Sequence, residues 1–197
     1  MPRALEIVIA SVAFLLTLPL LVLSLLVSSL LIGFPPFYSS RRRGRGGVEY
    51  THWKVRSMKS GRETGRVFFE SHRLNKWGRF LRRLHLDELP ELCHIISGRM
   101  SIVGPRPLPS SLLEGLDTSL RDTVKPGWTG PAQVRLLRTG RLDKRLQIRL
   151  DNHYVGHRST LYDVRIMLGT ISAAFTGRRQ DMSPCSTADR IEFGKRY

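Results

Sequence analysis

Residues 7–32 read IVIASVAFLLTLPLLVLSLLVSSLLI, and this stretch decides how the chain is organised. There is no Asp, Glu, Lys or Arg anywhere between Glu6 and Arg41. An α-helix of this length exceeds the roughly 30 Å thickness of the hydrocarbon core of a bilayer. A cleaved signal peptide has a shorter apolar region, of about 7–15 residues. We therefore predict a permanent membrane helix within residues 1–36.

Pro19 lies inside the apolar run and bears on the path of the helix. A proline in a helix interior removes a backbone donor and clashes with the preceding turn, so we predict a bend between Thr17 and Pro19. The run alone is compatible with a kinked transmembrane helix and with a re-entrant helix that leaves the membrane where it entered. Arginines follow at positions 41, 42, 43 and 45, against Arg3 before the run, which predicts a cytoplasmic location for the rest of the chain.

The remainder of the chain is strongly basic. The 197 residues include 32 Lys and Arg against 16 Asp and Glu, giving a formal net charge of +16, all of it downstream because Arg3 and Glu6 cancel. Such an excess indicates polyanionic partners: nucleic acid, phosphates or anionic lipid. The membrane segment and the lack of a recognised binding motif argue against nucleic acid. A hydrophobic content of 41% is enough for a core, and the two cysteines are too few for a disulfide scaffold.

We predict a mixed α/β, mostly helical body over residues 37–176 with a small β-hairpin or sheet. The local patterns indicate a turn at 44–47, a strand or hairpin arm at 48–55, a polar loop at 57–75, helical patterns at 77–97 and 161–175, and a polar tail at 177–197.

A further helix is predicted where apolar residues recur every fourth position with basic residues between them: Leu142, Leu146, Leu150 and Tyr154. Such a helix either packs on a core with a solvated face or lies on an anionic bilayer, and both arrangements fit the pattern. His153 and His157 have the spacing of metal ligands on a helix, but no third ligand accompanies them, so no metal site is predicted there.

An acidic pair, Asp87 and Glu88, follows a cluster of arginines at positions 79, 82 and 83. Asp is a good helix N-cap, and Pro90 would fall in the first turn of a helix capped by Asp87, so one interpretation is purely structural. The other is phosphate chemistry with a divalent metal, in which carboxylates bind the cation and guanidinium groups bind the anionic oxygens.

Two stiff loops each carry a cation. Residues 104–107 read Gly-Pro-Arg-Pro, and the two prolines restrict the backbone on either side of Arg106. Residues 125–131 read Lys-Pro-Gly-Trp-Thr-Gly-Pro, a second rigid turn that begins at Lys125. A fixed cation on each loop favours an anion site over two plain surface turns.

Taken in order, the motifs are FYSSRRRGR at 37–45, WKVRSM at 53–58, GRFLRRLHLDELPEL at 78–92, SGRMSIVGPRPL at 97–108, VKPGWTGPAQV at 124–134, and DNHYV at 151–155 followed by Ser159 and Asp163. This series resembles the bacterial sugar transferase family, the monotopic phosphoglycosyl transferases. The resemblance covers nearly the whole chain, and the run from Arg79 to Pro107 is highly specific.

The resemblance implies an enzyme that transfers a phosphosugar from a UDP-sugar to a polyprenyl phosphate such as undecaprenyl phosphate. UMP is released, and the product initiates glycoconjugate or exopolysaccharide assembly. The resemblance also favours a re-entrant helix that turns at Pro19. It implies a place in the cytoplasmic membrane among anionic inner-leaflet lipids, and it is compatible with a homodimer.

By resemblance, Asp87 is the nucleophile that forms an aspartyl phosphosugar, and Asp87 and Glu88 contact Mg²⁺. The cations expected to bind phosphate groups or to lie near the membrane surface are Arg82, Arg106, Lys54 and Arg56, with Lys125 added from the second stiff loop.

The chain departs from the family pattern in several places. Arg3 and Glu6 stand where the family usually has Lys-Arg and Asp, and Arg99 replaces an acid. Trp128 takes a normally aliphatic position and Pro131 a normally aromatic one. The acidic dyad is intact, so activity is expected. The alternatives are a family member without turnover and a basic scaffold at the membrane surface. No residue pattern identifies the sugar.

Overall fold

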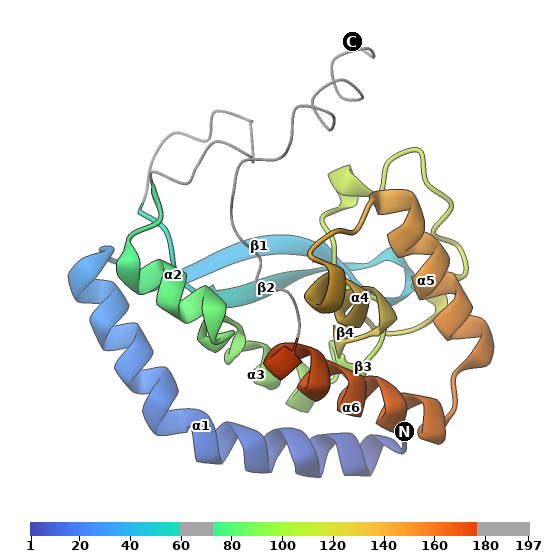
Figure 1. The fold of residues 1–197 in the computed structure, drawn as a ribbon, viewed down its shortest axis with the longest axis horizontal. Helices are drawn as coiled ribbons and strands as arrows, with labels where there is room; N and C mark the ends of the chain where they lie inside the picture. Colours follow the sequence, from blue (N-terminus) through green and yellow to red (C-terminus); the bar gives the residue numbers. More distant parts are fainter. Residues whose placement is uncertain (60–72, 177–197) are drawn as a thin grey trace.

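The computed structural model describes residues 1–59 and 73–176, a mostly helical chain with two small sheets (Figure 1). Its helices are α1 Arg3–Leu31, α2 Lys76–Arg83, α3 Glu91–Ile96, α4 Pro131–Thr139, α5 Lys144–His157 and α6 Thr160–Thr176. Its strands are β1 Phe37–Arg43, β2 Glu49–Val55, β3 Ser101–Val103 and β4 Gly127–Thr129. Single 3-10 turns include η1 Arg45–Gly47, η3 Leu86–Glu88, η4 Ser110–Leu112 and η5 Arg121–Thr123. The predicted tail at 177–197, Cys185 and most of the predicted loop at 57–75 lie outside the described residues.

Helix α1 runs without interruption through Pro19. Figure 1 shows that it bends along its length, as predicted for a helix with an interior proline. Thr17 Oγ1 donates to the Ala13 carbonyl at 2.7 Å, a contact of the kind that often accompanies helix bending. The helix is long and apolar enough to cross a membrane.

One face of α1 lies against the body and the other is exposed. Ala10 and Leu21 on the inner face are buried, whereas Leu16 and Leu30 on the outer face are 77% and 84% exposed. The inner face contacts α2, α3 and η3, so the body supports both halves of the helix. The exposed side chains are the ones that a bilayer would have to cover.

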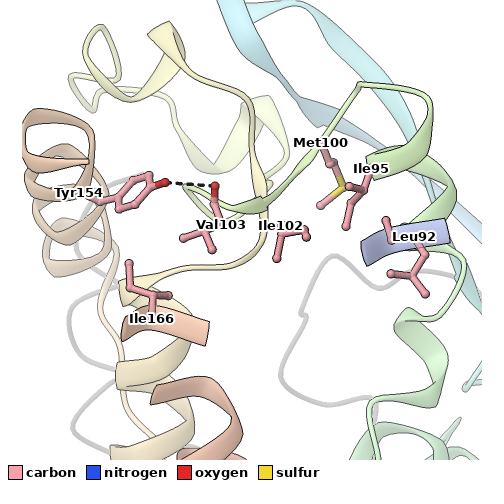
Figure 2. Packing of buried hydrophobic residues seen from close by; sticks show 8 residues of the cluster. Leu92, Ile95, Met100, Ile102, Val103, Tyr154 and Ile166 are labelled. Carbon is pink, nitrogen blue, oxygen red and sulfur yellow. Dashed lines mark hydrogen bonds between the residues drawn. The ribbon is translucent and has the colours of Figure 1, made fainter. Parts of the chain in front are cut away.

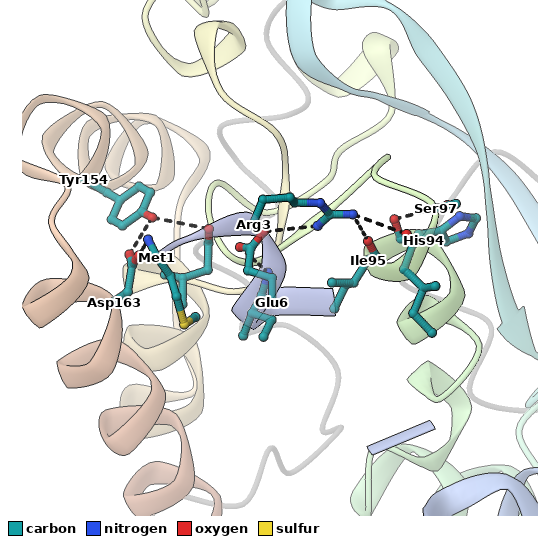
Figure 3. A network of polar contacts seen from close by, with 11 residues as sticks. Met1, Arg3, Glu6, His94, Ile95, Ser97, Tyr154 and Asp163 are labelled. Atoms are coloured by element: carbon teal, nitrogen blue, oxygen red, sulfur yellow. Dashed lines mark hydrogen bonds and ion pairs between the residues drawn. The ribbon is translucent and has the colours of Figure 1, made fainter. Parts of the chain in front are cut away.

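The start of α1 is tied to the body by a buried polar network (Figure 3). Arg3 donates to Glu6 Oε2 at 3.1 Å and to the carbonyl of Ile95. Glu6 Oε1 accepts from the Ile102 N–H at 3.3 Å. The Met1 ammonium group pairs with Asp163 nearby. Arg3 and Glu6, two departures from the family pattern, therefore join α1 to α3 and β3.

The predicted hairpin is confirmed. Strands β1 and β2 are antiparallel, with Phe37 opposite Val55 and Arg43 opposite Glu49. The turn between them contains η1, where Gly46 has φ 68° and Gly47 has φ 76°. These left-handed conformations favour glycine, which is why the Gly-rich stretch located the turn correctly.

Strand β3 ends immediately before the stiff loop that carries Arg106, and strand β4 lies within the stiff loop that begins at Lys125. Strands β3 and β4 pair in parallel, with Ser101 aligned to Gly127 and Val103 to Thr129. A Cβ atom on Gly127 would collide with the backbone of Gly104, so the absence of a side chain permits this close pairing. Strands of three residues are too short to show a period in the sequence, so the pairing was not predicted.

The predicted helical pattern at 77–97 is divided into α2, η3 and α3. The division comes at His85, which has a left-handed backbone with φ 55°. Helix α3 then begins at Glu91 with Pro90 in the N-cap position. The prediction that Asp87 caps a helix is therefore wrong. Because Pro90 has no N–H to contribute to a helix and fixes φ near the helical value, it suits a helix start, and Asp87 is left in the preceding turn.

Two apolar clusters form the core. The larger one joins α1, α3, β3, α5 and α6 through Ala10, Leu92, Ile95, Met100, Ile102, Val103, Tyr154 and Ile166. Figure 2 shows this packing, with the Tyr154 hydroxyl donating to the Val103 carbonyl at 3.3 Å. The smaller cluster consists of Leu21, Val55, Leu81 and Leu89. Phe14 of α1 packs against both clusters and so connects them.

Helix α5 takes the first of the two arrangements predicted for it and packs on the core. It begins at Lys144, after Asp143, whose side chain accepts from the Leu146 N–H. Its buried residues are Gln147, Ile148, Asp151 and Tyr154, so the inner face is shifted from the predicted apolar stripe. A buried Asp and Gln on this face explain why hydrophobic spacing alone misplaced it. The predicted helix at 161–175 is confirmed as α6.

Gly78 offers a test of how closely α2 approaches the segment after β2. A Cβ atom at this position would collide with the Ser57 carbonyl, whereas one on Gly156 in α5 would meet nothing within 4 Å. Gly78→Ala is expected to lower the free energy of unfolding by about 1–3 kcal/mol, as overpacking does. Gly156→Ala is expected to raise it by up to about 1 kcal/mol, because alanine favours helix. Thermal unfolding in detergent, followed by tryptophan fluorescence, measures both, and equal effects would contradict the predicted collision.

Candidate active site

The acidic dyad lies on the turn η3, which apolar packing holds against three other elements. Leu89, directly after the turn, is buried beside Leu81 of α2, Val55 of β2 and Leu21 of α1. Leu86 at the start of the turn packs against the same cluster. The backbone that carries both carboxylates is therefore fixed by contacts with α1, with α2 and with the hairpin.

Lys54 of β2 comes to the dyad from the hairpin. Its ammonium group forms a close ion pair with Glu88 and a second one, at 3.1 Å, with Glu91 Oε1. Burial by itself lowers the pKa of Lys54, but Glu88, Glu91 and Asp87 outweigh it and the pKa is raised. The side chain therefore stays charged. Lys54 was predicted to be functional, and the structure brings it directly to the acidic pair.

Glu88 is held in its ionised form. Burial acts to raise its pKa, but Lys54, the neighbouring His85 ring and the charge of Arg106 reverse the effect, so the pKa lies well below its usual range. The His85 Nδ1 atom lies 3.6 Å from Glu88 Oε2. Two predicted cations, Lys54 and Arg106, thus act on this carboxylate together.

Asp87 is in a different electrostatic situation from its neighbour. Burial raises its pKa, the negative charge of Glu88 raises it further, and Lys54 and Arg82 oppose both effects only in part. Within the described residues the Asp87 carboxylate forms no hydrogen bond or ion pair of its own. Two adjacent carboxyl groups whose pKa values are moved in opposite directions are suited to two different chemical roles.

Arg82 of α2 and Arg106 after β3 act on the dyad from two different elements. Arg82 Nε donates to Ser57 Oγ at 2.9 Å, and its charge acts on Asp87. The backbone carbonyl of Arg106 accepts a hydrogen bond from buried Arg121, which fixes the loop. Both arginines were predicted to bind phosphate, and their charges act on the dyad, Arg82 on Asp87 and Arg106 on Glu88, without a direct contact to either carboxylate among the described residues.

The remaining predicted cations lie elsewhere. Arg56 Nη1 donates to the Phe34 carbonyl at 3.3 Å, in the connection between α1 and β1. Lys125 lies near the start of α1, where Arg3 and Glu6 act on it, and burial with the charge of Arg3 lowers its pKa. It therefore lies beside the N-terminal network rather than beside the acidic dyad.

Glu91 and His52 are additional polar groups of the site that the sequence did not single out. Both are nearly fully buried, with 4% and 2% of their surface exposed, and His52 Nε2 donates to Glu91 Oε1 at 3.0 Å. His52 lies two positions before Lys54, so the two side chains share a face of β2. The sequence offered only two signs of these residues: the two-residue spacing of His52 and Lys54 in a predicted strand, and an acidic residue three positions after Glu88.

Asp87 and Glu88 are also the groups that could hold a divalent cation. Carboxylate oxygens suit Mg²⁺, which commonly takes one or two carboxylates and completes its coordination with water and substrate phosphates. In the described part of the chain no cluster of three or more His, Cys, Asp or Glu side chains has the arrangement of a metal site. The donor set therefore fits a cation shared with a phosphorylated substrate better than a fully enclosed structural metal.

A shallow depression of about 300 Å³ lies at the junction of α5 and α6 and is lined by His153, His157, Ser159, Leu161, Tyr162 and Arg165. None of the predicted site residues lines it. The dyad, with its surrounding cations, remains the candidate site.

The sequence matches the model of the family described as "Bacterial sugar transferase" over residues 1–177. A UDP-glucose:undecaprenyl-phosphate glucose-1-phosphate transferase of Escherichia coli K12 is 35% identical over 190 residues, covering 89% of this chain and 40% of that protein. The uncharacterized sugar transferase EpsL of Bacillus subtilis is 34% identical, covering 82% of this chain and 81% of that protein. The exopolysaccharide production protein ExoY of Sinorhizobium fredii is also 34% identical, covering 89% and 86%.

The chain thus spans less than half of the Escherichia coli relative but most of the other two. The matched region includes α1, the hairpin, the acidic dyad and the loops that carry Arg106 and Lys125. Because the family match covers all the described elements, this chain belongs to the bacterial sugar transferase family.

Proposed function

We propose that this protein transfers a sugar phosphate from a UDP-sugar to undecaprenyl phosphate and releases UMP. The observation that carries the proposal is the acidic pair on η3, in which Glu88 is ion-paired with Lys54 and Asp87 has no ion pair among the described residues, within the influence of the charges of Arg82 and Arg106. Relatives named for this type of reaction, with glucose and with N-acetylgalactosamine, support it. The products would initiate exopolysaccharide or glycoconjugate assembly.

The chemistry proceeds in two displacements at one phosphorus atom. An oxygen of the Asp87 carboxylate attacks the phosphorus that bears the sugar, and the bond from that phosphorus to the bridging oxygen breaks as UMP leaves. A phosphate oxygen of the polyprenyl acceptor then attacks the same phosphorus, the bond to Asp87 breaks, and the carboxylate is restored. Each step forms one phosphorus–oxygen bond and breaks another.

The cations of the site would reduce the electrostatic repulsion between the Asp87 carboxylate and the diphosphate of the substrate. A carboxylate is repelled by a diphosphate unless positive charge compensates for both. Arg82 and Arg106, whose charges act on the dyad, would bind phosphoryl oxygens, and Lys54 neutralises Glu88 beside the nucleophile. Mg²⁺ held by Asp87 and Glu88 would supply further charge stabilisation for the diphosphate and the departing UMP.

Asp87→Asn tests the assignment of the nucleophile. Because the carboxamide is a far weaker nucleophile, UMP release should fall by at least about 10³-fold while the protein stays folded and membrane-bound. The assay uses detergent-solubilised protein, undecaprenyl phosphate, Mg²⁺ and a panel of UDP-sugars. Asp117→Asn, at an exposed aspartate, is the matched control and should keep full activity.

Turnover by Asp87→Asn at the rate of the unsubstituted protein would refute the role of Asp87. If folded, unsubstituted protein released no UMP with any donor, the alternatives would gain weight, namely a family member without turnover and a basic scaffold at the membrane surface. The panel also identifies the sugar, which neither the sequence nor the site geometry specifies.

We further propose that α1 is re-entrant and that the body lies on the cytoplasmic face of the inner membrane. Both ends of the helix are bonded to the same body: Arg3 donates to Ile95, and the Leu31 carbonyl accepts from Asn75 Nδ2 at 3.2 Å. Near the end of α1, Trp77 Nε1 donates to Ser28 Oγ at 2.9 Å. A helix whose two ends are held by one domain is expected to have both ends on that domain's side of the membrane.

Helix α6 supports this orientation with a second apolar surface. Its buried face joins the core cluster that contains Ala10 of α1, and its outer face carries a stripe of exposed apolar side chains: Leu161, Val164, Leu168, Ile171 and Phe175. Figure 1 shows α6 on the same side of the molecule as the first half of α1. Anionic inner-leaflet lipids would meet exposed arginines such as Arg41 and Arg45, whereas Arg43 is paired with Asp122.

Cysteine labelling distinguishes a re-entrant helix from a spanning one. In a background with Cys93 and Cys185 replaced by serine, Ala4→Cys and Phe34→Cys mark the two ends of α1, and both positions are exposed. A membrane-impermeant maleimide should label both in inverted vesicles and neither in right-side-out vesicles. Asp117→Cys on the body is the control for cytoplasmic orientation. Labelling of the two helix ends from opposite faces would establish a spanning helix.

A further inference from the structure

The buried carboxylate of Glu91 has no part in the reaction proposed above, yet it contacts Lys54, the residue that neutralises Glu88. Glu91 opens helix α3 and is 4% exposed. Its Oε1 atom accepts from His52 Nε2 at 3.0 Å and lies 3.1 Å from Lys54 Nζ. A buried carboxylate is costly unless it is paired, and these two contacts pair it inside the protein.

Lys54 is consequently shared by two acids on different elements. Glu88 comes from the turn η3 and Glu91 from α3, while Lys54 itself comes from β2. A lysine side chain has a flexible four-carbon stem, and a single ion pair leaves it considerable rotational freedom. The second carboxylate restricts the ammonium group to one location, directly beside Glu88.

His52 is in turn held by an aromatic group. Its ring stacks on His94, with centroids 5.6 Å apart and 18° between the planes, and Tyr50 meets both rings edge-on. His94 Nε2 accepts from the Trp53 N–H at 3.3 Å. Burial lowers the pKa of His94 to about 4, so that ring remains a neutral acceptor. These contacts fix the plane of His52 and direct its Nε2–H at Glu91.

We propose that Glu91, oriented by His52, is a positioning residue that acts through Lys54 and fixes the ammonium group against Glu88 beside the nucleophile. This inference rests on the proposed function, because it assigns a role in that reaction. In this arrangement His94 and Tyr50 hold the ring of His52, and His52 orients Glu91. Glu91 in turn fixes Lys54 beside Glu88. A merely structural role for the buried pair would predict lower stability without any dependence on Lys54.

A double-mutant cycle tests this order. Glu91→Gln keeps the shape of the side chain, and its effect is measured alone and together with Lys54→Met as kcat and KM for UMP release, alongside the melting temperature. Glu91→Gln is expected to lower kcat by about 10- to 100-fold with KM for the UDP-sugar nearly unchanged, because small misplacements of catalytic groups have effects of this size. In the Lys54→Met background, Glu91→Gln should lower kcat almost no further, because Glu91 acts through Lys54.

Glu6→Gln is the matched control. Glu6 is also a buried, ion-paired glutamate, but it lies at the start of α1 and pairs with Arg3. Its substitution is expected to affect stability, and any effect on kcat should multiply with that of Lys54→Met. His52→Gln, which retains an N–H donor, should keep more activity than His52→Phe, which has none.

Multiplicative effects of Glu91→Gln and Lys54→Met, or a loss of stability from Glu91→Gln with unchanged kcat, would overturn the proposal and leave the proposed function in place. If the unsubstituted protein releases no UMP, the proposed function itself fails and the role of Glu91 fails with it. The two failures are therefore distinguished by the activity of the unsubstituted protein.

Discussion

The compensation of two adjacent carboxylates by Lys54 is the interaction on which the arrangement of the site depends. Asp87 and Glu88 are consecutive and largely buried, and like charges so close together raise each other's cost of ionisation. Lys54 compensates the charge of only one of the two carboxylates. Its ammonium group contacts Glu88, and Asp87 has no ion pair among the described residues. The inequality separates a carboxylate held in place from one that can react with substrate.

Helix α1 and the candidate site are parts of one packed unit. Leu21 of α1 shares an apolar cluster with Leu89, the residue that follows the dyad. The helix therefore supports the turn that carries the carboxylates, besides carrying the surface that a bilayer would cover. In the proposed reaction the acceptor is a lipid whose phosphate lies at the membrane surface, and the packing of the dyad against α1 would keep it close to that surface.

Several departures from the family pattern have structural explanations. Arg3 and Glu6 form the polar network that ties α1 to the body. Pro131 is the first residue of α4, a position where proline is favoured because its missing N–H needs no partner there. Trp128 lies in β4 and packs against the larger core cluster. These residues build the scaffold around the site, so their substitution relative to the family leaves the dyad and its cations in place.

The sequence by itself determined the features that depend on local patterns. The uncharged run predicted α1, the glycine-rich stretch located the hairpin turn, helical spacing predicted α6, and the acidic dyad with its arginines indicated the candidate site. Tertiary structure alone decided the division of the 77–97 helix at His85, the pairing of β3 with β4, and the contacts among His52, Lys54 and Glu91. The physical reason is the separation along the sequence of the residues that make these contacts. Lys54 and Glu88 are 34 positions apart, and His52 and Glu91 are 39 apart, so their contacts follow from how the hairpin packs on η3 and α3 and leave no period or spacing in the chain.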